Sequence, residues 1–359
     1  MKISLRKKNH GIAVIIALIA ITVLSIMAAA FALSMKVETT LAANANNDEK
    51  MLWLGRSGVE YARWILVQQA SIGAEPYDAL NQKWAGGTGS LLESNSVLSG
   101  ISLDNVPVGE GTISVKITDL ERKININNAP APVLQQVLTS MDVDASRISV
   151  VSDSIQDWID PDDSPRLAGA ESDYYQTLNP PYYAKNAPID DISELLMIKG
   201  VTWAMYSGGS ETNSGPVFQH KLGFGNSPGS EESYSFGLTN VFTAVSSGQI
   251  NINTADANVL AQLFPGGDLQ SAQDIVKFRA GPDGVEGNED DTPFRNVGQL
   301  SAAGVSPQAV QQLSQLCTVR STTFEVTITA SVGPQTRVFH AILLRTNGAN
   351  VQVVGFYWD

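Results

Sequence analysis

The hydropathy pattern begins with an uninterrupted apolar block close to the start of the chain. Residues 12–35 contain no charged side chain, whereas residues 1–11 contain four basic side chains and no acidic one. About 20 helical residues cross the hydrocarbon core of a bilayer, so residues 12–35 are predicted to form a transmembrane helix. Because basic residues tend to stay on the cytoplasmic side, the rest of the chain is expected outside the cytoplasm.

Apolar residues keep a helical spacing beyond this block. Charged residues now separate them, and no proline occurs before Pro76. This pattern is typical of an amphipathic helix. We therefore predict one helix from Ile12 to about Gln69, roughly 85 Å long at 1.5 Å per residue, whose second half packs on a globular head. A membrane helix followed by a separate amphipathic helix is the alternative interpretation.

Alternation of apolar and polar residues predicts four β-strands. Turn dipeptides, Gly333-Pro334 and Asn347-Gly348, separate the last three of them. The segment between the long helix and the first strand, residues 77–111, is rich in Gly, Ser and Asn and is predicted to be a loop. The expected fold is α+β, with the long N-terminal helix packed on a small antiparallel sheet. The predicted strands are residues 112–120, 323–332, 336–345 and 350–358.

The region between the first and second strands, residues 121–316, contains an internal repeat. The segment "KININNAPAPVLQQVL" at 123–138 matches "QININTADANVLAQLF" at 249–264. Further along, "PIDDISELLMIKGV" at 188–201 matches "PFRNVGQLSAAGV" at 293–305. We predict an inserted, mostly helical domain of two units, at about residues 123–205 and 249–316.

Polar residues in the repeat precede apolar segments that are predicted to be helices. Asn127 or Asn128 in the first unit, and Asn253 or Thr254 in the second, are expected to be helix N-caps. Between the units, residues 207–237 are rich in Gly and Ser, which predicts a surface loop.

Charge restricts the classes of partner. The formal net charge is -13, and beyond residue 11 there are 19 basic against 36 acidic side chains. Such an acidic body repels nucleic-acid phosphates and suits divalent cations or basic proteins better. Segments 198–201 and 303–305 are similar to helix-hairpin-helix DNA-binding modules. Lys199 is almost the only basic residue near them, so DNA binding is not expected.

Histidine and cysteine usage gives little indication of catalysis. His10 lies in the leader, His220 in the predicted loop and His340 in a predicted strand. No nucleophile elbow, HExxH zinc motif or phosphate-binding glycine loop occurs, so the protein is predicted not to be an enzyme. Cys317 is the only cysteine; it cannot form an intrachain disulfide and is expected to pack as a buried apolar residue.

An acidic segment at residues 157–173 is the strongest candidate for a metal site. Asp160 and Asp162 occupy alternate positions of the loop, as calcium-binding carboxylates often do. Glu171 lies eleven residues after Asp160, where a closing bidentate ligand would lie. Pro165 stands where an EF-hand needs glycine, so the segment is not an EF-hand. We expect structural Ca²⁺ here in preference to a solvated acidic loop. The candidate ligands are Asp157, Asp160, Asp162, Asp163, Glu171 and Asp173.

A second acidic segment, residues 281–294, is a weaker candidate for calcium. An acidic turn is the preferred interpretation, and a second calcium site or a contribution to the first is the alternative. Its candidate ligands are Asp283, Glu286, Asn288, Asp290 and Asp291.

The start of the chain resembles a type IV prepilin leader. Lys7 and Lys8 precede Gly11, and uncharged residues follow at once. The resemblance implies that prepilin peptidase cleaves between Gly11 and Ile12, that the new amine of Ile12 is methylated, and that the helix is retained. The stretch "SIMAAAFALS" leaves cleavage by signal peptidase as the alternative.

One departure from the prepilin pattern is informative. Family members usually have Glu at the fifth mature position, where it pairs with the amine of a neighbouring subunit, but here this position is Ile16. An unpaired carboxylate in hydrocarbon is costly. The absence of Glu therefore indicates a subunit at the tip of a filament.

The whole chain resembles the family of type II secretion minor pseudopilins called general secretion pathway protein K (GspK). The resemblance rests on the leader, on Ile16, and on the segments "LERKININNA", "DWIDPDDSPRLAGAESDYY", "PIDDISEL" and "SGQININTA". It implies a pilin-like head, formed by residues 36–120 and 317–359, with residues 121–316 as an inserted α-domain. It also supports the expectation of bound calcium.

The same resemblance implies a location and partners. The protein would be a single-pass protein of the inner membrane of a Gram-negative bacterium, with its body in the periplasm. It would initiate and cap the pseudopilus for export of folded proteins. Expected partners are the I-type and J-type minor pseudopilins, the major pseudopilin, prepilin peptidase and membrane lipid, while contact with exoproteins is left open. A tip minor pilin or adhesin of a type IV pilus is the alternative.

Overall fold

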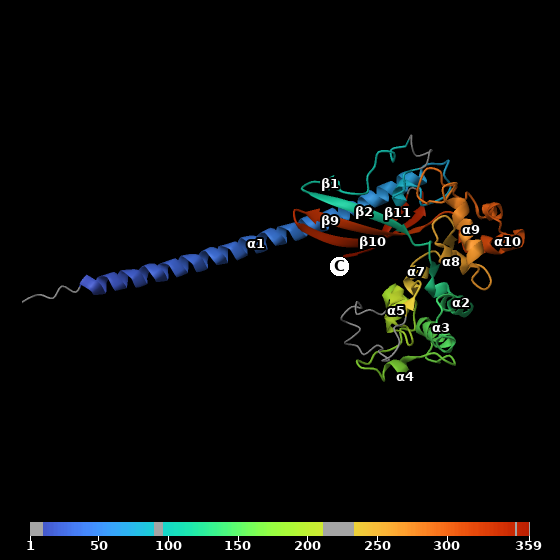
Figure 1. Cartoon of the computed structure of the whole chain (residues 1–359), viewed down its shortest axis with the longest axis horizontal. Helices are drawn as coiled ribbons and strands as arrows, with labels where there is room; N and C mark the ends of the chain where they lie inside the picture. Colours follow the sequence, from blue (N-terminus) through green and yellow to red (C-terminus); the bar gives the residue numbers. More distant parts are fainter. Residues whose placement is uncertain (1–9, 90–95, 211–232, 349, 359) are drawn as a thin grey trace, which may run out of the picture.

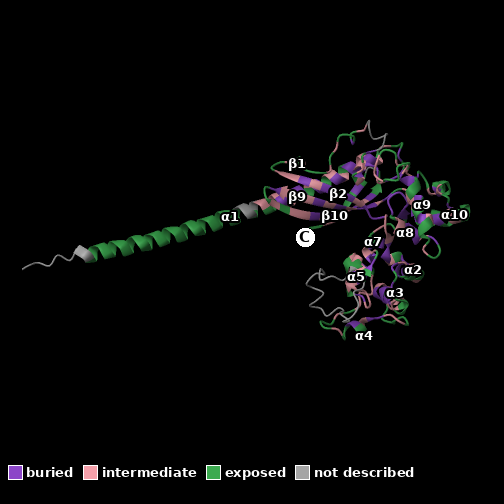
Figure 2. Ribbon diagram, in the orientation of Figure 1, coloured by how far each residue is buried: buried purple, intermediate pink, exposed green. Residues whose placement is uncertain are grey.

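The N-terminal helix is the longest element of the computed structural model, which describes residues 10–89, 96–210, 233–348 and 350–358. Helix α1 (His10–Ala70) is continuous over 61 residues, which confirms the predicted single helix. Its first half projects from the rest of the molecule with its side chains exposed (Figures 1 and 2). This half is long and apolar enough to cross a membrane. Residues 1–9 of the predicted leader lie outside the described residues.

The head contains a five-stranded antiparallel sheet in the order β1-β2-β9-β10-β11. The four predicted strands are confirmed. The fifth, β1, lies in the segment predicted to be a loop, as does the short helix η1 (Lys83–Ala85). Strand β1 has only three residues with a proline at its centre, and its order comes from pairing with β2, so its own sequence carries no strand pattern. The strands are β1 (Val106–Val108), β2 (Gly111–Asp119), β9 (Thr323–Val332), β10 (Gln335–Asn347) and β11 (Asn350–Trp358).

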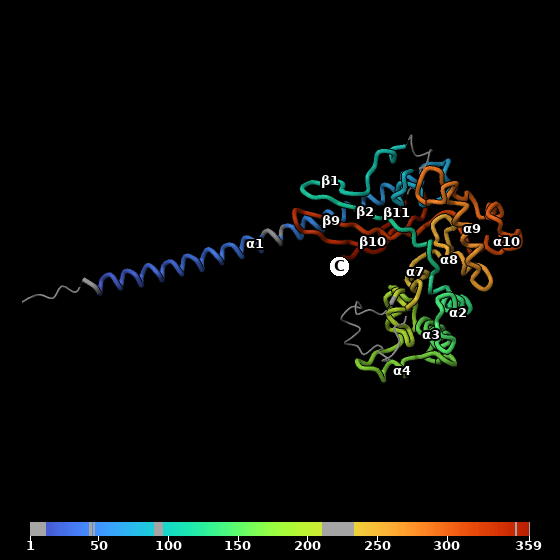
Figure 3. The backbone as a smooth tube through the Cα atoms, viewed as in Figure 1, coloured from blue at the N-terminus to red at the C-terminus, as the bar shows by residue number. Residues whose placement is uncertain are grey.

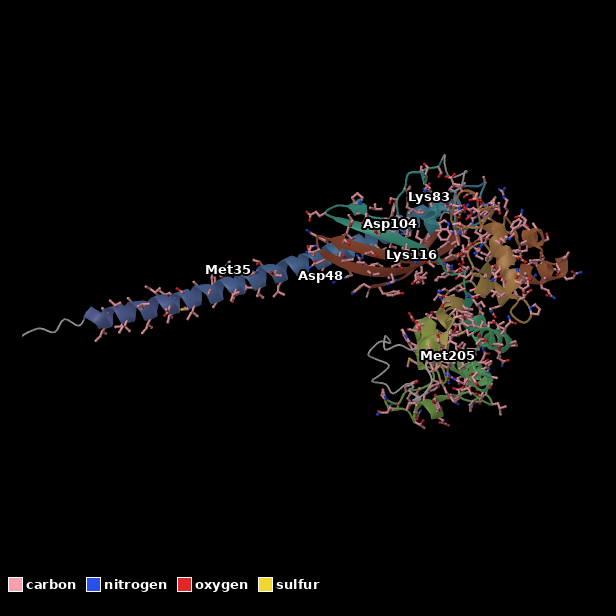
Figure 4. All side chains as sticks on the ribbon, in the orientation of Figure 1. Met35, Asp48, Lys83, Asp104, Lys116 and Met205 are labelled. Atoms are coloured by element: carbon pink, nitrogen blue, oxygen red, sulfur yellow. The ribbon has the colours of Figure 1, made fainter. Side chains whose placement is uncertain are left out.

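The second half of α1 packs on one face of this sheet. Its contact with the strands is close because two positions lack side chains: a Cβ at Gly55 would lie 2.7 Å from Phe339 Cγ, and one at Gly58 would lie 2.6 Å from Ile328 Cγ2. Asp48, which pairs with Arg337 at 2.8 Å, lies where the stem meets the head, whereas Met35 lies on the free stem (Figure 4). The buried residues that α1 contributes are Met51, Leu54, Val59, Ala62, Ile65 and Leu66.

The chain leaves the sheet after β2 and returns to it at β9 (Figure 3). The residues between them form a second hydrophobic core, separate from the core beneath the sheet. Of the loop predicted at 207–237, residues 211–232 lie outside the described residues, and its described ends pair as β4 and β5.

The region between β2 and β9 contains short helices and two-residue strands. In chain order these are β3 (Ile124–Asn125), η3 (Ile126–Asn128), α2 (Ala131–Ser140), α3 (Ala145–Ile159), α4 (Ser172–Tyr175), η4 (Ile192–Met197), α5 (Trp203–Ser207), β4 (Gly209–Ser210), β5 (Ser233–Tyr234), α7 (Leu238–Val241), β6 (Phe242–Thr243), β7 (Ile250–Asn251), α8 (Ala257–Ala261), α9 (Leu269–Arg279), η5 (Val297–Ala303), α10 (Pro307–Leu316) and β8 (Cys317–Thr318).

The matched sequence segments make matched hydrogen bonds. The Asn127 side chain donates to the carbonyl of Ile189 at 2.9 Å and accepts from its N–H at 2.7 Å. Asn253 makes the same pair of bonds with Phe294, both at 2.8 Å. In each unit, the last Asn of the Ile-Asn-Ile-Asn motif bonds to the backbone of the residue after a proline. That proline, Pro188 or Pro293, begins the other matched segment of the unit. The paired strands β3 with β6, and β7 with β8, are parallel in both cases.

These bonds correct the predicted helix caps. Helix α2 begins after Pro130 and α8 after Asp256, so neither is capped by the expected residues. Asn125 instead caps the short helix η3, and Asn127 is committed to Ile189. The physical reason is that a side-chain amide can bond to both the N–H and the C=O of a residue distant in sequence. Local sequence spacing does not reveal such a partner.

A buried cluster of charged residues joins the head to the second core. Arg345, near the end of β10, forms a buried ion pair with Asp78, with Nη1 lying 3.1 Å from Oδ1. Asp119, at the end of β2, accepts hydrogen bonds from the hydroxyls of Ser321 at 2.6 Å and Thr254 at 2.5 Å. Burial, together with the nearby carboxylate of Glu121, raises the pKa of Asp119 to about 7.

Substituting Gly58 by Ala is expected to destabilise the head. Forcing a methyl group against Ile328 costs about 1–3 kcal/mol, which opposes and exceeds the roughly 1 kcal/mol gained in helix propensity. Thermal unfolding of the purified full-length protein in detergent, followed by tryptophan fluorescence, measures the effect. Ser57→Ala on the neighbouring, more exposed position is the control. A Gly58→Ala protein as stable as the wild type would contradict this packing.

The cluster around Asp119 predicts a pH dependence of stability. Because its pKa is raised above the ordinary value of 3.8, the stability that Asp119 contributes is greatest below about pH 4 and is lost as the pH rises through 7. The Asp119→Asn protein, neutral at every pH, should lose less of its melting temperature than the wild type between pH 5 and 8. Asp104→Asn, at an exposed acid, is the control. Parallel curves for wild type and Asp119→Asn would show that the assignment is wrong.

Candidate functional site

Three carboxylates meet where α3 ends and α4 begins. Asp160 follows the last residue of α3, Asp162 lies in the loop, and Glu171 precedes the first residue of α4. One oxygen from each of these side chains lies within 4.8 Å of the others. Carboxylate oxygens at this spacing match the ligands and the cavity size that Ca²⁺ uses in proteins.

The electrostatics of this cluster favour a cation. Glu171 is buried, and neither of its carboxylate oxygens has a hydrogen-bond partner among the described residues; the same holds for Asp160 Oδ1. Burial, and then the charges of Asp157 and Asp160, raise the pKa of Glu171 to about 7. A buried carboxylate without a donor is costly, and a bound cation would remove that cost.

Asn186 adds an oxygen that the sequence did not indicate. Its amide N–H groups donate to the carbonyl of Asp162 at 3.0 Å and to the carboxylate of Asp163 at 2.9 Å. Its own Oδ1 is buried and has no partner among the described residues. Asn186 lies 15 residues after Glu171, outside any ligand spacing, so only the folded chain places its oxygen beside the acidic loop.

The other sequence-predicted ligands have different surroundings. Asp157 is fully buried and forms an ion pair with Arg166, whose Nη1 lies 2.7 Å from Asp157 Oδ1. Arg166 also pairs with Asp160. Asp163 accepts from the Ser172 hydroxyl at 3.1 Å. Asp173 is exposed and does not belong to the cluster. The structure thus brings together Asp160, Asp162 and Glu171, while Asp157 supports the loop through Arg166.

Asp157 and Lys199 contact the backbone of the loop between Asp160 and Glu171. The backbone at Gly169 approaches Asp157 so closely that a Cβ there would lie 1.8 Å from Oδ2. Lys199 Nζ donates to the carbonyl of Gly169 at 2.9 Å and lies 5.0 Å from the ring of Tyr174. Lys199, the basic residue of segment 198–201, therefore supports this loop.

In the second acidic segment, most of the polar groups bond to one another. Glu286 pairs with Arg279 at 2.5 Å. Asp283 accepts from the backbone of Val285 at 2.8 Å and from the amide of Asn288 at 2.8 Å. Asp290 accepts from the backbone of Asp283, and Asp291 accepts from that of Gly287. Asp291 Oδ1 is buried and has no partner among the described residues. The described carboxylates here form no group of three like that at Glu171.

Histidine and cysteine positions offer no catalytic arrangement among the described residues. His340 stacks on Tyr357 in the sheet, with ring centroids 5.2 Å apart, and His220 lies outside the described residues. Burial raises the pKa of the Cys317 thiol to about 12, so the thiol stays protonated and packs as an apolar group.

Family models for "Type II secretion system (T2SS), protein K" match residues 114–208 and 250–320. Type II secretion system protein K of Klebsiella pneumoniae is 30% identical over 112 residues, 28% of this chain and 34% of that protein. The putative protein K of Escherichia coli K12 is 25% identical over 205 residues, 56% of this chain and 61% of that protein. The aligned part of the chain therefore spans between about a third and three fifths of these two relatives.

Two further similarities extend over almost the whole chain. Protein K of Pseudomonas aeruginosa is 24% identical over 365 residues, covering 98% of this chain and 93% of that protein. A chain in the crystal structure of the GspK-GspI-GspJ complex from the type 2 secretion system of enterotoxigenic Escherichia coli superposes with a TM-score of 0.62 at 20% identity, covering 89% of this chain and 99% of that one. At this identity the superposition establishes a shared fold.

Proposed function

Because this chain belongs to the type II secretion system protein K family, we propose that it acts as a minor pseudopilin of that system, anchored in the inner membrane with its head in the periplasm. The observation that carries this proposal is helix α1, whose first half is exposed and apolar and whose second half is part of the head core. An anchor continuous with the folded body can transmit the position of the filament directly to the head.

The exposed half of α1 would provide the assembly energy. Its apolar side chains from Ile12 to Leu41 are about half exposed or more. This exposed apolar segment is longer than the roughly 20 helical residues that span a bilayer. We propose that they pack against the stems of neighbouring subunits, where van der Waals contact and close helix approach drive association in lipid. Ile16 in place of an acidic residue suits a subunit with no neighbour on one side.

We propose that the subunit initiates and caps the pseudopilus, beside the I-type and J-type minor pseudopilins. The related complex named above contains GspK with GspI and GspJ, which supports the same partners here. The region between β2 and β9 extends well beyond the sheet (Figure 1), and its bulk would obstruct addition of another subunit above it. The alternative role in a type IV pilus receives no support from the family matches.

We propose further that residues 121–316 are an inserted domain built from two related units. The support is the pair of matched sequence motifs together with the equivalent clamps of Asn127 on Ile189 and of Asn253 on Phe294. Two units that bury one shared core would explain why both motifs keep an asparagine that makes the same pair of backbone bonds.

A structural calcium ion is proposed at the cluster of Asp160, Asp162 and Glu171. The unpartnered oxygens of Glu171, Asp160 and Asn186 fit a hard cation that takes six to eight oxygen ligands. The ion would fix the loop between α3 and α4 and would replace the hydrogen bonds that these oxygens lack. It has no proposed catalytic part.

Removing calcium is expected to lower the melting temperature of the full-length protein, since a ligand that binds only the folded state stabilises it. At a free calcium concentration 100 times its dissociation constant the loss would be about 2.7 kcal/mol. The measurement is thermal unfolding with added CaCl₂ and with excess EDTA. An identical melting temperature in both conditions would count against a structural ion.

Substitutions locate the ion within the loop. Asp160→Asn with Glu171→Gln should abolish the calcium-dependent shift in melting temperature. Asp173→Asn, a neighbouring exposed acid outside the cluster, should retain it. If Asp173→Asn abolished the shift and the double substitution did not, the ion would lie elsewhere in the acidic segment.

Gly11→Ala is expected to leave the precursor uncleaved, because the resemblance to prepilin leaders implies that the peptidase recognises glycine itself before the cut. Mass spectrometry of the membrane-extracted protein measures cleavage after Gly11 and a methyl group on Ile12. His10→Ala, beside it in the leader, is the control and should be processed. Normal maturation of the Gly11→Ala protein with continued secretion would refute the prepilin assignment.

A further inference from the structure

Arg166 lies between the candidate calcium ligands and a buried carboxylate. Its Nη1 donates to Asp157 Oδ1 at 2.7 Å and also to Asp160 Oδ2. Asp160 is one of the three residues whose carboxylate oxygens meet at the candidate site. One guanidinium nitrogen therefore joins the acidic cluster to a carboxylate inside the molecule.

Asp160 is shared between this arginine and the candidate site. Its Oδ2 contacts Arg166, whereas its Oδ1 is buried and has no hydrogen-bond partner among the described residues. A carboxylate that binds a guanidinium through one oxygen can still offer the other oxygen to a cation. Its attraction for that cation is weaker, because a positive charge beside it already compensates part of its negative charge.

The guanidinium is fixed in this position. The Asp157 side chain that holds it is 0% exposed, and the backbone N–H of Arg166 donates to both oxygens of Asp157 at 3.2 Å. An arginine side chain does not lose its proton in proteins. Its positive charge therefore stays beside Asp160 at any pH at which the protein folds.

The shape of the loop has supports other than this guanidinium. The N–H of Ala168 donates to Asp153 Oδ2 at 3.2 Å, and the N–H of Ser164 donates to Asp162 Oδ1 at 2.8 Å. The backbone bonds of residue 166 do not need its side chain. Loss of the guanidinium would leave all of these bonds in place, so its main effect at the site is on charge.

We propose that Arg166 is an internal counter-cation that sets the calcium affinity of this site. It compensates the charges of Asp157 and Asp160 when calcium is absent, and it weakens calcium binding by engaging one oxygen of Asp160. This inference rests on the proposed calcium site and adds the residue that sets its affinity. The consequence is a loop that keeps a compensating charge without calcium and binds the ion only at a higher free calcium concentration.

The test is titration calorimetry of the full-length protein in mild detergent, treated with chelator and titrated with CaCl₂. Arg166→Gln should lower the calcium dissociation constant about tenfold, because it removes a positive charge beside a ligand carboxylate. The side chain is 40% exposed, and solvent screening keeps the effect from being larger.

Two further variants are the controls for this titration. Arg166→Lys keeps the charge, and a single ammonium can replace the one nitrogen that makes both contacts, so its dissociation constant should stay within about threefold of the wild-type value. Arg122→Gln removes a guanidinium that pairs with Asp256 at 2.7 Å, outside the acidic segment. It should leave the dissociation constant unchanged.

Melting temperatures separate a charge effect from a loss of support. In EDTA, Arg166→Gln should melt below the wild type, since the buried Asp157 loses its cation. Added CaCl₂ should raise its melting temperature by more than that of the wild type, because tighter binding stabilises the folded state more. A residue that only supported the loop would lower both melting temperatures and would weaken calcium binding.

A second comparison avoids an uncompensated buried charge. Asp157→Asn and the double variant Asp157→Asn with Arg166→Gln both lack the buried carboxylate, so removal of the guanidinium leaves no buried charge unpaired. The double variant should bind calcium about tenfold more tightly than Asp157→Asn alone.

The outcomes are distinguishable. If the wild-type protein binds no calcium, the proposed calcium site and this inference fail together. If the wild-type protein binds calcium and loss of the Arg166 guanidinium leaves binding equal or weaker in either background, the site stands and the role of Arg166 is overturned.

Discussion

A buried cluster of one arginine and three carboxylates, Arg345 with Asp78, Asp119 and Glu121, determines how the two parts of the molecule are joined. Arg345 pairs with Asp78 and lies 5.0 Å from the ring of Phe324. Asp119 accepts hydrogen bonds from Asn251 and Ser321, and Glu121 accepts them from Thr322 and Thr323. Buried charges without partners are costly. The ends of β2 and β9 therefore have to meet where these bonds can form, and the intervening residues fold on a fixed base.

The stem imposes a second constraint, which is close contact. Helix α1 can lie directly on β9 and β10 because Gly55 and Gly58 leave room for Phe339 and Ile328. A close-packed interior transmits displacement, so a shift of the exposed, apolar half of α1 would be passed to the sheet.

The candidate metal site belongs to the region of the second core, which is separate from the core beneath the sheet. The loop from Asp160 to Glu171 is supported by Arg166 and Lys199 from within the second core, and the proposed cation would complete it with the oxygens of Glu171 and Asn186. Calcium would thus order the loop between α3 and α4, whereas apolar burial holds together both the head and the second core.

The sequence by itself determined the elements whose signal is local: the apolar length of α1, the alternation in the four main strands, the repeated Ile-Asn-Ile-Asn motif and the acidic loop. Periodicity reports which side of an element is buried, so these predictions needed no partner. Only the tertiary structure decided the rest: the pairing that orders β1, the bonds of Asn127 and Asn253 to Ile189 and Phe294, the ion pair of Asp157 with Arg166, and the bonds of Asn186 to the acidic loop. Each depends on groups distant in sequence, and a polar side chain selects among many possible partners only when folding has brought one of them within hydrogen-bond distance.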